Sequence, residues 1–296
     1  MDLPVTGPSS LAYAAPSAAP FVLLRPARQS APLVFASPHS GRDYPADFIA
    51  SARLDPIELR RSEDSFVDEL FAAAPSLGAP LLAATFPRAF CDPNREPFEL
   101  DPEMFEDELP TWVNTKSPRV GAGLGTIARI VSSGEPIYRG RLRFAEAERR
   151  VRQYWEPFHA ALAELIVATH AQFGATLLID CHSMPAGCCG APPHADFVLG
   201  DVHGTACHPD VTRRIKRLLA RRGYAVRRND PYAGGYITRH YGRPRDHMHA
   251  VQVEISRALY MDEGRIARSR RFAATKADMA ELIASLAAEA TSLLRQ

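Results

Sequence analysis

Two histidines stand at the ends of apolar runs, where a buried strand would lead into a loop. His39 follows the run in APLVFASPHSG, and His182 ends the run in ATLLIDCHSMP. Because the carboxyl ends of parallel strands meet at one edge of a sheet, we expect the two imidazoles to converge there. Two imidazoles and one carboxylate form a common ligand set for a catalytic zinc ion, and Glu63 and Asp64 are both candidates for the carboxylate. The alternative is a pair of loop-capping histidines and a solvated acidic pair.

An acidic residue, Glu254, interrupts the apolar run in QVEIS. An unpaired charge inside a buried strand is costly, so this carboxylate requires a partner or a function. It is either a general base that takes a proton from a water beside a cation, or one half of an ion pair with an arginine. His247 and His249 offer a second metal pair, but strand alternation places them on the face opposite Glu254. Asp180, on the same strand face as His182, is placed to orient that imidazole or to cap the strand end.

Two further segments carry groups suited to an anionic ligand. Asn94 and Arg95 join an amide to a planar guanidinium, a combination that suits the binding of a carboxylate. Gly234-Gly235 permits close backbone approach to a ligand, and several donors, including Arg239, follow directly. These segments predict a binding site for an anion, although neither contains a phosphate-binding fingerprint.

Strands and helices alternate along the chain from Pro32 onward. Apolar runs predict strands at the two histidine-bearing runs and at Ala79–Ala84, Arg88–Cys91, Ala195–Gly200, Tyr224–Arg228 and Ala250–Ile255. Apolar residues at helical spacing predict helices from Asp55 to near Pro75 and over Phe144–Phe173, Pro209–Arg222 and Arg271–Leu294. The alternation predicts an α/β fold with a doubly wound, mainly parallel mixed sheet.

Two stretches lack this periodicity. Residues 1–30 are rich in Pro, Ala and Ser and are interpreted as a flexible leader, so that residues 31–296 form a single domain. Between Glu96 and Gly140, prolines punctuate a long irregular segment. Such segments in compact domains are more often functional loops than filler.

The composition limits the class of partner. The 296 residues include 35 basic and 34 acidic side chains, for a formal net charge of +1. This balance disfavours a nucleic-acid partner or a polybasic membrane anchor, and no uncharged apolar run approaches the roughly 18 residues of a membrane span. The five cysteines form neither a C-x-x-C pair nor an evenly spaced framework, which favours a reducing cytoplasm. The composition does not specify an oligomeric state.

Six motifs, taken in chain order, resemble those of the N-formylglutamate amidohydrolase family, also called N-formylglutamate deformylases. They are SPHSG, EDSFVDEL, DPNRE, IDCHSMP, GGYITRHYG and VQVEIS, and the likeness extends from about Pro32 to Asp262. The resemblance implies a phosphorylase/hydrolase-like α/β fold related to zinc carboxypeptidases. It also implies zinc-dependent hydrolysis of N-formyl-L-glutamate to formate and L-glutamate, a step of histidine degradation.

The resemblance further implies roles for individual residues. Zinc would be held by His39, Asp64 and His182, with Glu63 as the alternative ligand, and the general base would be Glu254. Substrate carboxylates would be bound by Asn94, Arg95 and Arg239. Two departures, Pro93 within the D-x-N-R motif and the acidic stretch EPFELDPEMFEDELP after it, lie beside the expected substrate anchor. The alternatives are therefore a deacylase or carboxypeptidase-like peptidase acting on another N-acyl amino acid, and a non-catalytic arginine-rich binding module.

Overall fold

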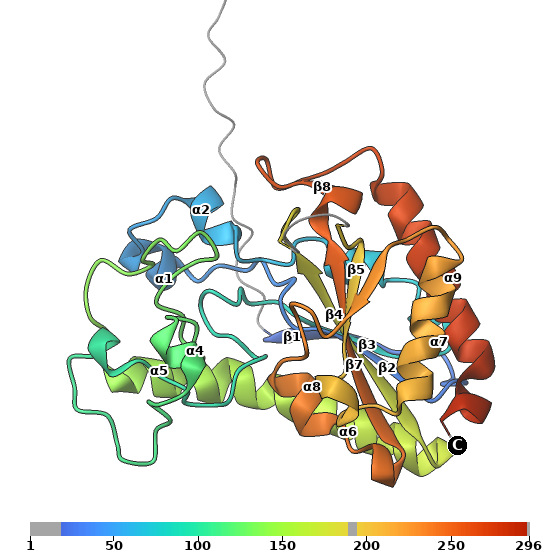
Figure 1. Ribbon diagram of the computed structural model, residues 1–296. Helices are drawn as coiled ribbons and strands as arrows, with labels where there is room; N and C mark the ends of the chain where they lie inside the picture. The colour runs from blue at the N-terminus through green and yellow to red at the C-terminus, as the bar shows by residue number, and fades with distance from the viewer. Residues whose placement is uncertain (1–18, 189–193, 295–296) are drawn as a thin grey trace, which may run out of the picture.

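A seven-stranded mixed sheet forms the centre of the molecule (Figure 1). The computed structural model describes residues 19–188 and 194–294, and its strands lie in the order β1-β3-β2-β4-β7-β5-β6. Their bounds are Phe21–Leu24 (β1), Leu33–Ser37 (β2), Leu81–Ala84 (β3), Thr176–Met184 (β4), Phe197–Gly200 (β5), Val226–Arg228 (β6) and Met248–Ser256 (β7). β3, β2, β4 and β7 are parallel neighbours, whereas β1 is antiparallel to β3 and β5 is antiparallel to β7. The predicted mainly parallel mixed sheet is confirmed.

Helices cover both faces of this sheet. One face carries α6 (Glu156–Phe173) and α8 (Tyr236–Tyr241), and the other carries α3 (Val67–Leu70), α7 (Pro209–Ala220) and α9 (Phe272–Leu293). β4 is buried along its whole length because it is covered from both sides. Its alternate side chains enter two separate cores, so that Leu177 and Ile179 pack on the α9 side and Leu178 packs on the α6 side.

A lobe stands beside the sheet and contains most of the short helices (Figure 1). It comprises α1 (Ala46–Ser51), α2 (Pro56–Arg60), η2 (Pro102–Met104), α4 (Pro118–Gly121) and α5 (Phe144–Arg150). A π-helical turn, η3 (Val151–Trp155), joins α5 to α6, so the helix predicted over Phe144–Phe173 is present with this turn inside it. The irregular segment between Glu96 and Gly140 contains only η2 and α4 as named helices or strands.

The remaining short elements connect these parts. They are η1 (Pro75–Leu77), η4 (Val202–Gly204), η5 (Pro244–Asp246), η6 (Arg257–Leu259), β8 (Met261–Asp262) and β9 (Ala267–Arg268). Within residues 19–188 and 194–294, no helix is long and apolar enough to cross a membrane.

The helix predicted from Asp55 to near Pro75 is interrupted, and this prediction is wrong in its middle. Asp55 caps α2 as expected, but the helix ends at Arg60 and resumes only with α3. The backbone N–H of Asp64 donates to the carbonyl oxygen of His39 at 3.0 Å, and Phe66 adopts a left-handed φ of 68°. Tertiary hydrogen bonding therefore replaces the helical ladder between Arg60 and α3.

Two other local predictions are wrong. The strand expected over Arg88–Cys91 is a turn, in which the backbone N–H of Phe90 donates to the carbonyl oxygen of Pro87 at 2.9 Å. The leader expected over residues 1–30 contains β1, which pairs with β3 because a half-buried apolar tetrapeptide completes the sheet edge. Residues 1–18 lie outside the described part of the chain.

Candidate active site

Three side chains from separate elements meet beyond the carboxyl ends of the central strands. His39 follows β2, His182 lies near the end of β4, and Asp64 lies in the break between α2 and α3. One ligand atom from each lies within 4.8 Å of the others, and all three residues are buried. We call these three residues the His-Asp-His cluster. The interruption of the predicted helix is therefore what brings the acidic member into the cluster.

The two imidazoles of the cluster present the same nitrogen to Asp64. Its Oδ2 lies 3.4 Å from Nδ1 of His39 and 3.0 Å from Nδ1 of His182. The opposite nitrogens bind carboxylates, with Nε2 of His39 at 2.6 Å from Asp92 and Nε2 of His182 at 2.9 Å from Asp180. Metal-ligating histidines are typically oriented in this way by a carboxylate behind the ring.

One atom of the cluster lacks a partner. Nδ1 of His39 is buried and has no hydrogen-bond partner among the described residues. For His182, burial alone would lower the pKa, but Asp180 and Asp64 raise it well above the usual value. The donor set of two imidazoles and one carboxylate, with an unsatisfied nitrogen facing the carboxylate, fits a divalent metal such as zinc.

Of the two adjacent acids, Asp64 lies in the cluster and Glu63 does not. Glu63 is hydrogen-bonded by the hydroxyl of Tyr44 at 2.8 Å and by Nε of Arg60 at 2.9 Å. The second oxygen of Asp64, Oδ1, accepts from Nη2 of Arg257 at 3.2 Å. Arg257 therefore fixes the carboxylate so that Oδ2 faces the imidazoles.

The alternative histidine pair lies elsewhere. Nδ1 of His249 accepts a hydrogen bond from the backbone N–H of His208 at 3.2 Å. Neither His247 nor His249 belongs to a group of potential metal ligands within the described residues.

Glu254 lies beside the cluster because of the strand register. β7 pairs with β4 so that Glu254 is directly opposite His182, on the same face. Burial raises the pKa of Glu254 to about 7; the nearby Asp64 also raises it, while His182 opposes the shift. The side chain accepts a hydrogen bond from Nε2 of Gln252 at 2.7 Å and forms no ion pair with an arginine in the described residues. A carboxyl group with a pKa near neutrality is suited to act as a general base.

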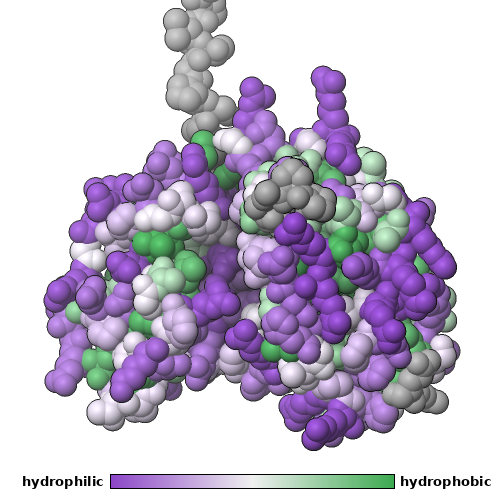
Figure 2. Space-filling model, viewed as in Figure 1, coloured by the Kyte–Doolittle hydropathy of each residue, from purple (hydrophilic) through white to green (hydrophobic). Residues whose placement is uncertain are grey.

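The cluster and Glu254 open into a cavity of about 290 Å³, the inner cavity. It is lined by polar groups that include His39, His182, Glu254, Asn94, Arg88, Arg95, Arg119 and Arg239. An outer cavity of about 200 Å³ shares Asn94, Arg95, Arg119, Gly235 and Arg239 with it and adds Glu96, Glu99 and Tyr236. Arg119 belongs to α4 in the lobe and Arg239 to α8 beside the sheet, and Figure 2 shows a hydrophilic hollow between these two parts.

The loop that carries Asn94 and Arg95 is held from several sides. Oδ1 of Asn94 accepts from the backbone N–H of Ile237 at 2.8 Å, and Nε of Arg95 donates to the carbonyl oxygen of Leu124 at 2.8 Å. A Cβ on Gly235 would lie 2.4 Å from the Asn94 side chain. This glycine therefore permits a close approach to Asn94 instead of the predicted approach to a ligand.

Positive charge accumulates along the cavity wall. Burial, together with the neighbouring Arg88 and Arg119, lowers the pKa of Arg95 to about 10, although Asp92 acts to raise it. Nη2 of Arg88 is paired with Asp92 at 2.7 Å. The guanidinium groups of Arg119 and Arg239 make no hydrogen bond or ion pair with any described residue. The wall is therefore suited to an anion with more than one negative group.

Sequence reasoning missed Asp92, Arg88, Arg119 and Arg257. Asp92 stands in the same DPNRE motif as Asn94, and Arg257 directly follows the VQVEIS motif. Position next to a motif was the available signal for these two residues. Arg88 begins a predicted strand that the structure replaces with a turn, and Arg119 stands in the irregular segment, so neither gave a signal.

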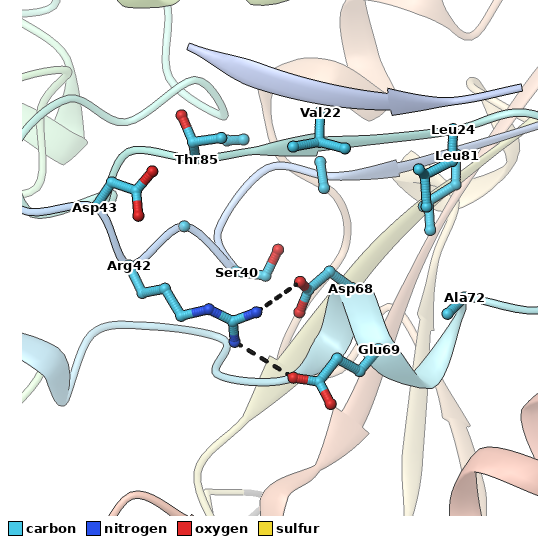
Figure 3. A pocket seen from close by; sticks show the side chains of 13 residues that line it. Val22, Leu24, Ser40, Arg42, Asp43, Asp68, Glu69, Ala72, Leu81 and Thr85 are labelled. Carbon is cyan, nitrogen blue, oxygen red and sulfur yellow. Dashed lines mark hydrogen bonds and ion pairs between the residues drawn. The ribbon is translucent and has the colours of Figure 1, made fainter. Parts of the chain in front are cut away.

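A separate cavity of about 370 Å³ borders β1 and α3 (Figure 3). Within it, Arg42 is paired with Asp68 at 3.3 Å and with Glu69 at 3.4 Å. Arg42 is thus already bound by two protein carboxylates, and no member of the His-Asp-His cluster lines this cavity. Its chemistry is therefore less specific than that of the inner cavity.

The arrangement is that of a hydrolase active site in an α/β enzyme. It combines a potential metal cluster, a buried carboxylate with a raised pKa and a cationic wall at the strand ends.

Comparisons with known proteins identify the family. The family model of N-formylglutamate amidohydrolase matches residues 31–261. The N-formylglutamate deformylase of Pseudomonas putida is 31% identical over 241 residues, covering 78% of this chain and 82% of that protein. The N-formylglutamate deformylase of Pseudomonas aeruginosa is 32% identical over 274 residues, covering 88% and 94%. The crystal structure of N-formylglutamate amidohydrolase from Ralstonia eutropha is 41% identical, with a TM-score of 0.87 over 94% of this chain and 99% of that chain. The chain therefore belongs to the N-formylglutamate amidohydrolase family.

Proposed function

We propose that this protein hydrolyses N-formyl-L-glutamate to formate and L-glutamate, with zinc bound by His39, Asp64 and His182. The observation that carries the proposal is the register of β4 and β7, which places Glu254 beside the His-Asp-His cluster at the base of an arginine-lined cavity. The names of the relatives supply the acyl amino acid.

The metal would occupy the space between the two Nδ1 atoms and Oδ2 of Asp64. The unpartnered Nδ1 of His39 supports this position. Zinc, when bound, polarises the amide carbonyl and lowers the pKa of a water molecule. Asp92 and Asp180 hold the imidazoles with Nδ1 toward that space.

Glu254 would move the proton. Its carboxylate would accept a proton from the water that attacks the formyl carbon and deliver it to the amide nitrogen as the C–N bond breaks. The products are formate and the free amino group of glutamate, so the atoms balance. The raised pKa of about 7 supports both the acceptance and the return of the proton.

The cationic wall would bind the two carboxylates of the substrate. Arg95 uses Nε and Nη1 for carbonyl oxygens but keeps further N–H groups, because a guanidinium has five of them. Asn94 uses its amide oxygen for Ile237, and its NH₂ nitrogen lies 3.1 Å from Nε2 of His182, so that its second N–H would serve the substrate. Arg239 would provide a second anion contact from the opposite side of the cavity.

Two measurements on the same preparations test the proposal. The parent protein should contain about one zinc per chain and should favour N-formyl-L-glutamate in a turnover screen of N-formyl, N-acetyl and N-formimino amino acids. His182→Ala should lose the metal, whereas His170→Ala, which alters a partly buried histidine on α6, should keep it. Full zinc in His182→Ala would remove that residue from the ligand set, and a preference for another N-acyl amino acid would identify a different deacylase.

We also propose a reducing cytoplasm as the location. In the described part of the chain, Cys91, Cys181, Cys188 and Cys207 are free, and all but Cys188 are buried. Free buried thiols are typical of proteins from reducing compartments.

A further inference from the structure

We propose that Arg119, on α4 of the lobe, binds the side-chain carboxylate of the substrate and gives the enzyme its preference for an acidic side chain. This inference rests on the proposed function and assigns a residue that neither the sequence motifs nor the names of the relatives indicate. It makes the lobe a specificity-determining part of the active site.

The arginines of the inner cavity differ in how far their guanidinium groups are already bound by other protein groups. Arg88 is paired with Asp92, and Arg95 donates to two backbone carbonyl oxygens. Arg119 and Arg239 both line the inner and the outer cavity, and neither guanidinium group has a hydrogen-bond or ion-pair partner among the described residues. The two uncommitted cations of the cavity are therefore the ones that border its outer part.

Two acidic residues border the same outer cavity as Arg119. Glu96 and Glu99 also line the outer cavity and would be expected to neutralise Arg119. Instead, Glu96 accepts from the side-chain amide of Asn114 at 2.8 Å, and Glu99 accepts from the hydroxyl of Ser117. Both carboxylates are thus engaged by neutral donors, and Arg119 retains its charge for a ligand.

Hydrogen bonds fix the backbone of the turn that carries Arg119. The hydroxyl of Ser117 caps α4 by accepting from the backbone N–H groups of Arg119 at 3.1 Å and Val120 at 3.2 Å. The same segment is tied to Glu99, because the N–H of Thr126 donates to the Glu99 carbonyl oxygen at 2.8 Å. The turn that carries Arg119 is therefore fixed to the segment that follows Arg95, and a fixed backbone lowers the entropy lost on binding.

The two carboxylates of N-formylglutamate lie at different distances from the scissile amide. The scissile amide must lie at His39, His182 and Glu254, which line the inner cavity and not the outer one. In N-formylglutamate the α-carboxylate is one bond from the carbon that bears the amide, and the side-chain carboxylate is three bonds away. Nη2 of Arg95 lies 3.9 Å from Asp92, which binds His39 of the cluster, so the nearer carboxylate falls beside Arg95. The guanidinium groups of Arg119 and Arg239 have no such link to the cluster among the described residues, and the farther carboxylate extends toward them in the outer cavity.

The test compares two substrates that differ by one charge. Arg119→Met removes the charged group and keeps an unbranched apolar stem, and we expect kcat/KM for N-formylglutamate to fall about 10- to 100-fold while that for N-formylglutamine falls less than about 3-fold. Arg119→Lys should fall between the parent and Arg119→Met for N-formylglutamate, because an ammonium keeps the charge without the planar fork. An equal loss for both substrates, or no loss, would overturn the proposal.

A matched control separates recognition from damage to the lobe. Arg129 stands in the same irregular segment, pairs with Asp101 at 2.9 Å and lines neither the inner nor the outer cavity. Arg129→Met should leave the ratio of the two kcat/KM values unchanged. A shift of that ratio equal to the shift in Arg119→Met would assign the effect to the lobe as a whole and overturn the proposal.

A binding measurement distinguishes this proposal from the proposed function. Calorimetric titration with L-glutamate and L-glutamine needs no turnover. If the parent protein does not hydrolyse N-formylglutamate, the proposed function fails, yet Arg119→Met should still abolish a preference for L-glutamate over L-glutamine. If the parent hydrolyses N-formylglutamate and Arg119→Met binds both amino acids as the parent does, the role of Arg119 fails alone.

Discussion

The two walls of the inner cavity are built differently. On the sheet side, His182 and Glu254 are paired in register on two long neighbouring strands, which are buried except for Met248 at the start of β7. On the lobe side, Arg119 stands on a four-residue helix inside a largely irregular segment. His182 and Glu254, which are suited to bond cleavage, thus lie on the regular scaffold, and Arg119, which is suited to substrate recognition, lies in an irregular segment. The difference indicates that the reaction type and the substrate choice can be altered separately.

The largest effect is expected on the sheet side. Glu254→Gln should lower kcat by about 10²- to 10⁴-fold, because the amide keeps the shape of the side chain and cannot accept a proton. The metal content and the melting temperature should stay near those of the parent. The control Glu146→Gln alters a carboxylate of α5 outside both cavities and should retain activity. If Glu254→Gln turned over within a few-fold of the parent, Glu254 would be a structural carboxylate.

A smaller effect, on zinc affinity, is expected for Asp92, which binds the imidazole of His39 from outside the cluster. Asp92→Asn should weaken zinc binding about 10- to 100-fold, because Asp92 orients the imidazole of His39. Competition with a chelator measures this affinity directly. Asp201→Asn is the control, since Asp201 is equally buried and is held by Arg228 outside the cluster. Equal zinc affinity in Asp92→Asn and the parent would show that the carboxylate does not orient the ligand.

On the lobe side, a conservative change should produce a modest and selective loss. Arg95→Lys should reduce kcat/KM for N-formylglutamate about 10-fold, because lysine keeps the charge but cannot form the bidentate contact. N-formylglutamine should suffer equally if Arg95 binds the α-carboxylate, which both substrates have. An Arg95→Lys enzyme with parental kcat and KM would contradict the assignment of substrate recognition to this loop.

The smallest effect concerns stability in acid. Burial alone would raise the pKa of Asp92, but Arg88, His39 and Arg95 together hold it well below its usual value. Such a group stabilises the fold above its unfolded pKa of about 3.9, and this contribution is lost as the pH falls toward its folded pKa. Between about pH 5 and pH 3, the metal-free parent should lose on the order of 1 kcal/mol more unfolding free energy than metal-free Asp92→Asn. Denaturant titrations at each pH measure this difference, and parallel curves would contradict it.

The sequence predicted the sheet side of the site better than the lobe side. His39, His182 and Glu254 were recognisable because a polar residue at the end of an apolar run, or inside one, is a local signal. The position of Asp64 depended on a break that apolar periodicity does not reveal, since the competing hydrogen bond comes from His39. Arg119 was not recognisable, because its place in the cavity depends on the packing of the irregular segment. The relation to zinc carboxypeptidases stays a prediction.

The chain passes a site residue at every crossing between the lobe and the sheet. His39 precedes α1, Asp64 separates α2 from α3, and Asn94 and Arg95 follow β3. At the return from α5 to α6, Nε1 of Trp155 donates to the carbonyl oxygen of Arg95 at 3.0 Å. The lobe is therefore not a cassette that could be excised or exchanged between relatives at its boundaries. A chimera would preserve the active site only if its junctions lay inside the lobe, away from these crossings, and natural insertions should accumulate there for the same reason.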